Sequence, residues 1–197
     1  MTAPNATTGV DGDTRSATDA TAGADGTTGP AADAEAGSGR PRTLRDLLDA
    51  HEVEQAVLRL GWLVDGRDWD RLTALFADTV TEDNTSLWGG EPVTEAGTAL
   101  VERWRAVLSG TDASQHLITG VLSEVGDGAA VATANVVIVV RRADHLGGPL
   151  WACGGRYRME LAASAGGWRI TSFTLTAAWT AGNPNVITGA PRPQEEA

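Results

Sequence analysis

The chain has 197 residues, enough for one domain of ordinary size, with a formal net charge of −11 and 42% hydrophobic residues. Its fifteen basic residues are arginines scattered along the chain, whereas a nucleic-acid-binding protein gathers positive charge on one surface, so that class is disfavoured. The single cysteine, Cys153, cannot form an internal disulfide, and without a Cys/His cluster the sequence predicts no structural zinc site and favours the reducing cytoplasm.

Residues 1–42 consist mainly of Ala, Thr, Gly and Asp. They contain too few large apolar side chains to offset the entropy of ordering, so we expect an acidic, disordered N-terminal tail. The chain shows neither a basic start followed by an apolar block nor an apolar run of about eighteen residues, which predicts no signal peptide and no membrane span. The folded domain is expected over 43–182 and a flexible C-terminal tail over 183–197.

The folded part is predicted to begin with three helices. Thr43 and Asp46 are typical of a capping box at the start of a helix over about 44–64. Gly66 then supplies a turn, and Asp68 is placed to cap a second helix. A polar strand is expected over about 79–87 and a third helix over about 98–108. Apolar residues recur at helical spacing, predicting buried faces formed by Leu44, Leu47, Leu48, Val57, Leu58, Leu60 and Leu63, by Trp69, Leu72, Leu75 and Phe76, and by Leu100, Val101, Trp104, Val107 and Leu108.

After Gly110 the hydrophobic period changes to two, which indicates strands. We expect them at about 114–125, 129–143, 150–163 and 168–180, joined by glycine-containing hairpin connections. Three helices followed by hairpin-linked strands predict an α+β fold, with the helices packed on one face of an antiparallel sheet. A strongly curved sheet would enclose, with the helices, a cone with a central pocket.

Four segments in this order resemble the SnoaL-like families of the nuclear transport factor 2-like superfamily: 63–72, Phe76, 115–118 and 167–170. The resemblance covers residues 43–182 and implies the cone-shaped fold of that superfamily. It is closest to the branch that contains scytalone dehydratase and hexachlorocyclohexane dehydrochlorinase. In that branch an Asp at the end of the first helix and a His on the strand after the third helix form a catalytic dyad, which implies Asp65 and His116 here.

The chain also departs from that branch. Scytalone dehydratase has a second catalytic His on the next strand, where this chain has the apolar run 136–140, and a Ser and an Asn on the following strand, where it has Gly155 and Tyr157. Scytalone is therefore disfavoured as the substrate. Related cyclases and epoxide hydrolases use an acid on the last strands, and 170–175 contains none, so those mechanisms are disfavoured too.

An Asp–His pair can act as a general base without a metal or organic cofactor. The carboxylate holds one ring nitrogen, fixes the tautomer and stabilises the imidazolium that forms, leaving the other nitrogen to take a proton from carbon. We therefore expect a lyase, cyclase or isomerase that acts on a polyketide- or terpenoid-like intermediate of secondary metabolism, such as antibiotic biosynthesis. The alternatives are a helix-end role for Asp65 and a core role for His116. His51 and His145 are expected to face solvent.

The aromatic residues are unusual, with seven tryptophans against one tyrosine and two phenylalanines. Trp69 and Trp168 are explained by packing. Our candidate substrate-binding residues are Trp62, Trp88, Trp104, Trp151, Tyr157 and Trp179, with a place in the core as the alternative for each tryptophan. Several aromatic walls would suit an apolar, ring-containing small molecule. A homodimer through the exposed face of the sheet is also expected. Two other functions remain open: a non-catalytic ligand-binding or oligomerisation module, and a pocket that templates a pericyclic or spontaneous cyclisation.

Overall fold

The computed structural model describes residues 43–143 and 147–189. The predicted N-terminal tail, His145 and the last eight residues lie outside this part of the chain. The first helix, α1 (Leu44–Asp65), begins at the predicted capping box. The Thr43 hydroxyl accepts the Asp46 N–H at 3.1 Å, and the Asp46 carboxylate accepts the Thr43 N–H at 3.0 Å.

The buried stripe of α1 is shorter than predicted. Leu44, Leu47 and Leu48 are exposed, and burial begins only at Val53. The prediction was wrong for the first turns because apolar spacing does not reveal where along a helix the packing partner begins. From Val53 onward one face of α1 packs on the sheet, and the apolar residues of this face reach Val64, directly before Asp65.

The second helix, α2 (Trp69–Thr73), is also shorter than predicted. Asp68 caps it as expected, since its carboxylate accepts the Arg71 N–H at 3.3 Å. Phe76 was placed on this helix, but it begins strand β1 (Phe76–Asp83), where it pairs with Ile170. The predicted strand 79–87 is therefore shifted, and its last residues belong to the short helix α3 (Thr85–Trp88). Strand β2 (Val93–Ala96) was not predicted, whereas helix α4 (Gly97–Ser109) was.

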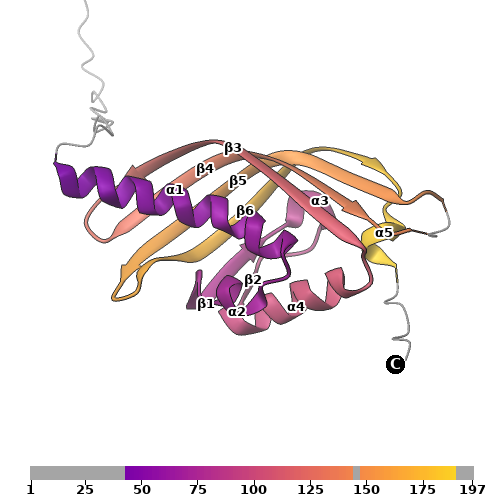
Figure 1. Ribbon diagram of the computed structural model, residues 1–197, viewed down its shortest axis with the longest axis horizontal. Coiled ribbons are helices and arrows are strands. Elements are labelled where there is room, and N and C mark those ends of the chain that lie inside the picture. Colours follow the sequence, from indigo (N-terminus) through magenta and orange to yellow (C-terminus); the bar gives the residue numbers. More distant parts are fainter. Residues whose placement is uncertain (1–42, 144–146, 190–197) are drawn as a thin grey trace, which may run out of the picture. The chain divides into compact units, whose positions relative to one another are not determined.

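The four long strands agree closely with prediction: β3 (Ala113–Val125), β4 (Ala129–Arg141), β5 (Leu150–Ser164) and β6 (Gly167–Gly182). Together with β1 and β2 they form one six-stranded sheet in the order β2-β1-β6-β5-β4-β3. The sheet is mixed rather than fully antiparallel, because β1 pairs with β6 in parallel. Figure 1 shows the long strands curving over α1, α2 and α4, which lie together on one side of the sheet. The predicted α+β fold is confirmed.

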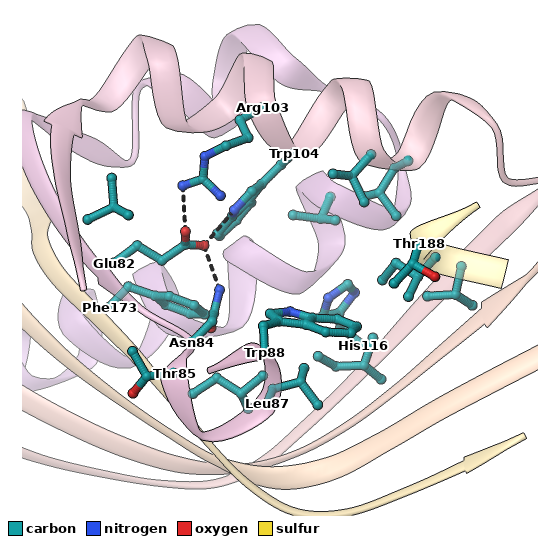
Figure 2. Close-up of a pocket in the computed structure, with 18 of the residues that line it drawn as sticks. Glu82, Asn84, Thr85, Leu87, Trp88, Arg103, Trp104, His116, Phe173 and Thr188 are labelled. Carbon is teal, nitrogen blue, oxygen red and sulfur yellow. Dashed lines mark hydrogen bonds and ion pairs between the residues drawn. The ribbon is translucent and has the colours of Figure 1, made fainter. Parts of the chain in front are cut away.

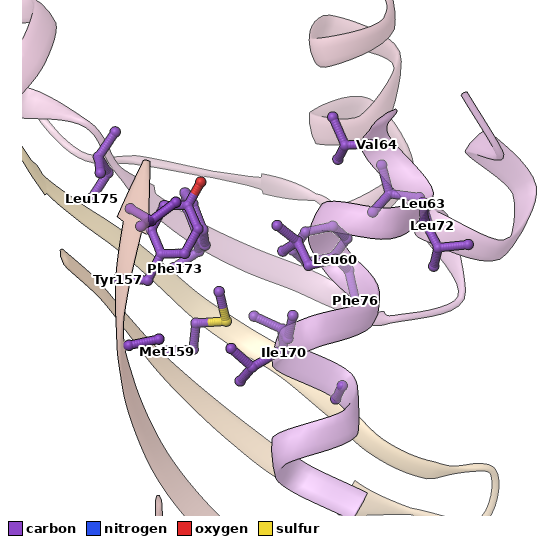
Figure 3. Packing of buried hydrophobic residues seen from close by; sticks show 14 of the residues in the cluster. Leu60, Leu63, Val64, Leu72, Phe76, Tyr157, Met159, Ile170, Phe173 and Leu175 are labelled. Atoms are coloured by element: carbon purple, nitrogen blue, oxygen red, sulfur yellow. The ribbon is translucent and has the colours of Figure 1, made fainter. Parts of the chain in front are cut away.

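The core lies between this concave face and the helices. Figure 3 shows Leu60 of α1 facing the sheet, on which Met159 and Ile170 are buried, and Leu63 lying beside Leu72 of α2. The fold also extends past the predicted domain end at 182. Helix α5 (Asn185–Thr188) follows β6. Its Val186 side chain is only 1% exposed and belongs to the core. Sequence analysis did not predict this short helix, because its apolar residues have polar neighbours.

Candidate active site

A cavity of about 680 Å³ opens between the helices and the concave face of the sheet. This volume is in the usual range for a small-molecule site, roughly 300–1,000 Å³. Its walls come from α1, α3, α4, α5 and from strands β1 to β6, and they are largely apolar. Five aromatic side chains line it: Trp88, Trp104, Trp151, Tyr157 and Phe173. Such a cavity suits an apolar molecule that contains rings.

Asp65 and His116 meet at the wall of this cavity. Nδ1 of His116 lies 2.7 Å from Oδ1 of Asp65, and the His116 backbone N–H donates to Oδ2 at 2.7 Å. The Ser114 hydroxyl donates to Oδ1 at 2.9 Å. Asp65 ends α1 and His116 lies on β3, where alternation turns Ser114 and His116 to the same face. Both carboxylate oxygens are therefore held by β3.

The contacts of Asp65 keep it ionised. Burial acts to raise the pKa of the Asp65 carboxyl, but the hydrogen bonds and charge of His116, with the Ser114 hydroxyl, outweigh burial and hold this pKa below its ordinary value. The carboxylate caps no helix end, because its partners belong to β3. An ionised carboxylate only accepts hydrogen bonds, so Nδ1 of His116 carries a proton, and the lone pair of the neutral ring lies on Nε2.

The His116 ring is turned toward the cavity, which it lines. Its side chain is only 10% exposed. Nδ1 and the backbone N–H both engage Asp65, and within the described part of the chain Nε2 has no hydrogen-bond partner. In this arrangement Asp65 fixes one ring nitrogen of His116, and the other is available to a bound molecule.

Tyr157 presents a hydroxyl to the same cavity. Burial raises the pKa of this hydroxyl far above its ordinary range, and the nearby Asp65 and Glu82 carboxylates act in the same direction. The group therefore stays protonated. Among residues 43–143 and 147–189 the hydroxyl has no hydrogen-bond partner, so its proton is available to an acceptor on a ligand.

A second polar group, which sequence reasoning missed, lines another part of the cavity and centres on Glu82. Glu82 is only 5% exposed. It accepts hydrogen bonds from Arg103 at 2.5 Å, from the Trp104 indole at 2.7 Å and from the Asn84 amide at 2.8 Å. Figure 2 shows these four residues together and set apart from His116. Two-residue alternation from Phe76 through Val80 would have placed Glu82 on the inner face, but the strand was predicted to start too late.

The structure confirms a place in the cavity wall for only some of the tryptophans predicted to bind substrate. Trp88, Trp104 and Trp151 line the cavity, and Trp88 stacks on Trp151 with ring centroids 5.8 Å apart. Trp62 and Trp179 do not line it. Trp62 is 81% exposed, because it lies on the face of α1 opposite the buried stripe.

Trp179 is 48% exposed and covers Gly154, where an added Cβ atom would meet the Trp179 ring. Trp69 and Trp168 are packed against or within the core, as predicted, and His51 is exposed. Within the described residues no three His, Cys, Asp or Glu side chains are grouped to bind a metal. No helix among them is long and apolar enough to span a membrane.

The family described as the SnoaL-like domain matches residues 45–174, and the chain therefore belongs to that family. A comparison with curated proteins found no match.

Solved structures share the fold. The Kfla4162 protein from Kribbella flavida is 24% identical, with a TM-score of 0.68 over 73% of this chain and 99% of its own. A scytalone dehydratase candidate from Novosphingobium aromaticivorans is 15% identical, with a TM-score of 0.61 over 77% of this chain and 97% of its own. A type 2 hexachlorocyclohexane dehydrochlorinase is 14% identical, with a TM-score of 0.59 over 76% and 97%.

Proposed function

We propose that the protein is a cofactor-independent enzyme that removes a proton from carbon in an apolar, ring-containing substrate. The contact between Asp65 and His116 carries the proposal, because it fixes one ring nitrogen and leaves Nε2 facing the cavity. Neighbours in the fold that are named for dehydration and dehydrochlorination support it.

The reaction begins when Nε2 of His116 takes a proton from a carbon next to a carbonyl group. The electron pair of the broken C–H bond moves toward the carbonyl oxygen, and the Tyr157 hydroxyl donates a hydrogen bond to the charge that develops there. Asp65 stabilises the imidazolium. Loss of a hydroxide at the neighbouring carbon, with a proton from His116, gives dehydration. Return of the proton to another carbon gives isomerisation. Attack of the carbanion on a second carbonyl, whose oxygen then takes the proton from His116, gives cyclisation.

The expected substrate is a polyketide- or terpenoid-like intermediate of secondary metabolism, processed in the cytoplasm. Metabolite profiling of a strain that lacks the gene provides the test, because the accumulated precursor identifies the substrate. The purified protein should convert this precursor without added metal or cofactor.

His116→Ala should lower turnover by about 10²- to 10⁴-fold, the usual contribution of a positioned base, with nearly unchanged ligand affinity. Asp65→Asn should also be severely impaired, because it offers His116 no counter-charge. The double variant should be scarcely worse than His116→Ala, as expected of two groups that serve one step. If His116→Ala turns over the natural precursor at the wild-type rate, the base assignment is wrong. The cavity would then act through its shape alone, as a template that folds a reactive substrate.

A further inference from the structure

The Glu82 group, formed by Glu82, Asn84, Arg103 and Trp104, is not used by the proposed proton transfer. It lines the same cavity as His116. A buried carboxylate at a cavity wall is costly unless it is paired, and three donors satisfy this one. The Glu82 carboxylate is therefore held in place at the cavity wall.

The orientation of the Asn84 amide follows from its neighbour. An ionised carboxylate can only accept hydrogen bonds, so the Asn84 amide nitrogen must face Glu82, at 2.8 Å from Oε1. The amide oxygen points elsewhere, and it is buried with no hydrogen-bond partner in the described residues. A buried acceptor without a donor is unfavourable, and it is satisfied when a donor is brought to it.

Helix capping does not explain Asn84. Asparagine is common at helix N-caps, and Asn84 occupies that position before α3. Its side chain, however, makes no capping hydrogen bond and turns to Glu82 instead. The residue therefore serves the cavity wall rather than the helix.

The charge of the region limits what can bind beside Asn84. The Arg103 guanidinium is shared between Glu82 and Glu95, which it contacts at 2.5 and 2.6 Å. Two carboxylates thus face one guanidinium. Glu91 also lines the cavity and adds negative charge. A carboxylate ligand would be repelled here, whereas a neutral hydrogen-bond donor would not.

We propose that Asn84 Oδ1 is a specificity-determining acceptor, and that the substrate is a neutral ring compound with a hydroxyl group remote from the carbon that His116 deprotonates. This inference rests on the proposed function, because it names the substrate class for the same cavity. Since Oδ1 is shielded from solvent, the hydroxyl reaches it through a side-chain rotation of the kind that is common on binding. The hydroxyls of Thr85 and Thr188 also line the cavity, and they already donate to Asp83 and to the Pro184 carbonyl.

Calorimetric titration with three matched probes tests the inference: β-naphthol, its methyl ether and β-naphthoate. The wild-type protein should bind β-naphthol about tenfold more tightly than the methyl ether, the value expected for one hydrogen bond to a buried acceptor. β-Naphthoate should bind most weakly. In Asn84→Leu the preference for β-naphthol over its ether should fall to nearly onefold. Thr188→Val removes a lining hydroxyl that is already engaged, and it should retain the full preference.

Equal affinity of the wild-type protein for β-naphthol and its ether, or no binding of any probe, would contradict the inference even if Asn84→Leu fails to fold. So would a preference that survives in Asn84→Leu. His116→Ala should keep the preference, and its loss there would mean that the hydroxyl binds at the base instead. Because this assay measures binding alone, a His116→Ala protein with normal turnover would overturn the proposed function while leaving the Asn84 result intact.

Discussion

Gly61 of α1 packs directly against His116 of β3: a Cβ atom at position 61 would lie only 3.0 Å from Cβ of His116. The same atom would lie 3.1 Å from Cδ1 of Ile118. Glycine is unfavourable inside a helix by about 1 kcal/mol relative to alanine. Its presence here therefore reflects the space that the base requires.

Gly61→Ala should move His116 by a few tenths of an ångström and lower turnover by about tenfold, because general-base catalysis depends steeply on position. The protein should remain folded, since the gain in helix propensity offsets part of the tighter packing. Steady-state kinetics and thermal unfolding measure the two effects. Gly126→Ala is the control, because its added methyl group meets nothing within 4 Å, and it should change neither quantity.

Asp65 should make stability depend on pH in the acid range. The folded state holds the Asp65 pKa below its ordinary value of about 3.9, so the ionised group contributes stability above that pH. This contribution is lost as the pH falls from there through the lower pKa of the folded state. Thermal unfolding of the wild type and Asp65→Asn should therefore differ most near neutrality, and the difference should shrink below about pH 4. A difference that is constant with pH would show that His116 and Ser114 do not favour the ionised form.

Tyr157 is the only tyrosine of the chain, so phenolate absorbance reports on this residue alone. Burial raises the pKa of its hydroxyl, and phenolate should not form in the folded protein near the ordinary value of about 10. The associated stability is present below that pH and is lost above it, and the absorbance should rise together with unfolding. In denaturant the titration should return to the ordinary value. If phenolate forms near the ordinary pKa while the protein remains folded, the Tyr157 hydroxyl is not the buried, protonated donor that we describe. Tyr157→Phe should lower turnover and leave the fold intact.

The outer face of the sheet should mediate a homodimer. Leu117 pairs with Val137, Val137 with Gly154, and Gly154 with Trp179, so these residues form one row across four strands. Leu117 and Trp179 are each 48% exposed at the ends of this row. Light scattering at micromolar concentration should give a dimeric mass, and Leu117→Asp should give a monomer. Leu47→Asp changes an exposed leucine on α1 and should leave the dimer unchanged. A monomeric wild type would refute the prediction.

Sequence reasoning worked where a residue's surroundings are set by its own element. The long strands follow from alternation over more than ten residues, and Thr43 and Asp68 act as caps because capping depends on neighbours three positions away. The meeting of Asp65 and His116 was implied by family resemblance, since no local pattern reports a contact between two elements. Glu82 was missed because its strand was predicted to start too late, and the contacts that Glu82 and Asn84 make could not be predicted from a local pattern either. Their partners Arg103 and Trp104 lie on α4, and only the folded chain brings them together.

The parallel pairing of β1 with β6 has a consequence for the order of folding. Strands β3 to β6 are joined by short hairpins, whereas β1 reaches β6 only across nearly the whole folded chain. Closing so long a loop is slow, and the contacts that it makes form late. Glu82 and Asn84 stand at the end of β1, so the cavity wall that they form is completed after the hairpins. In refolding experiments, recovery of ligand binding should therefore lag behind the appearance of strand signal, and a ligand that touches both this wall and His116 should hold the last-formed part of the sheet in place and slow unfolding.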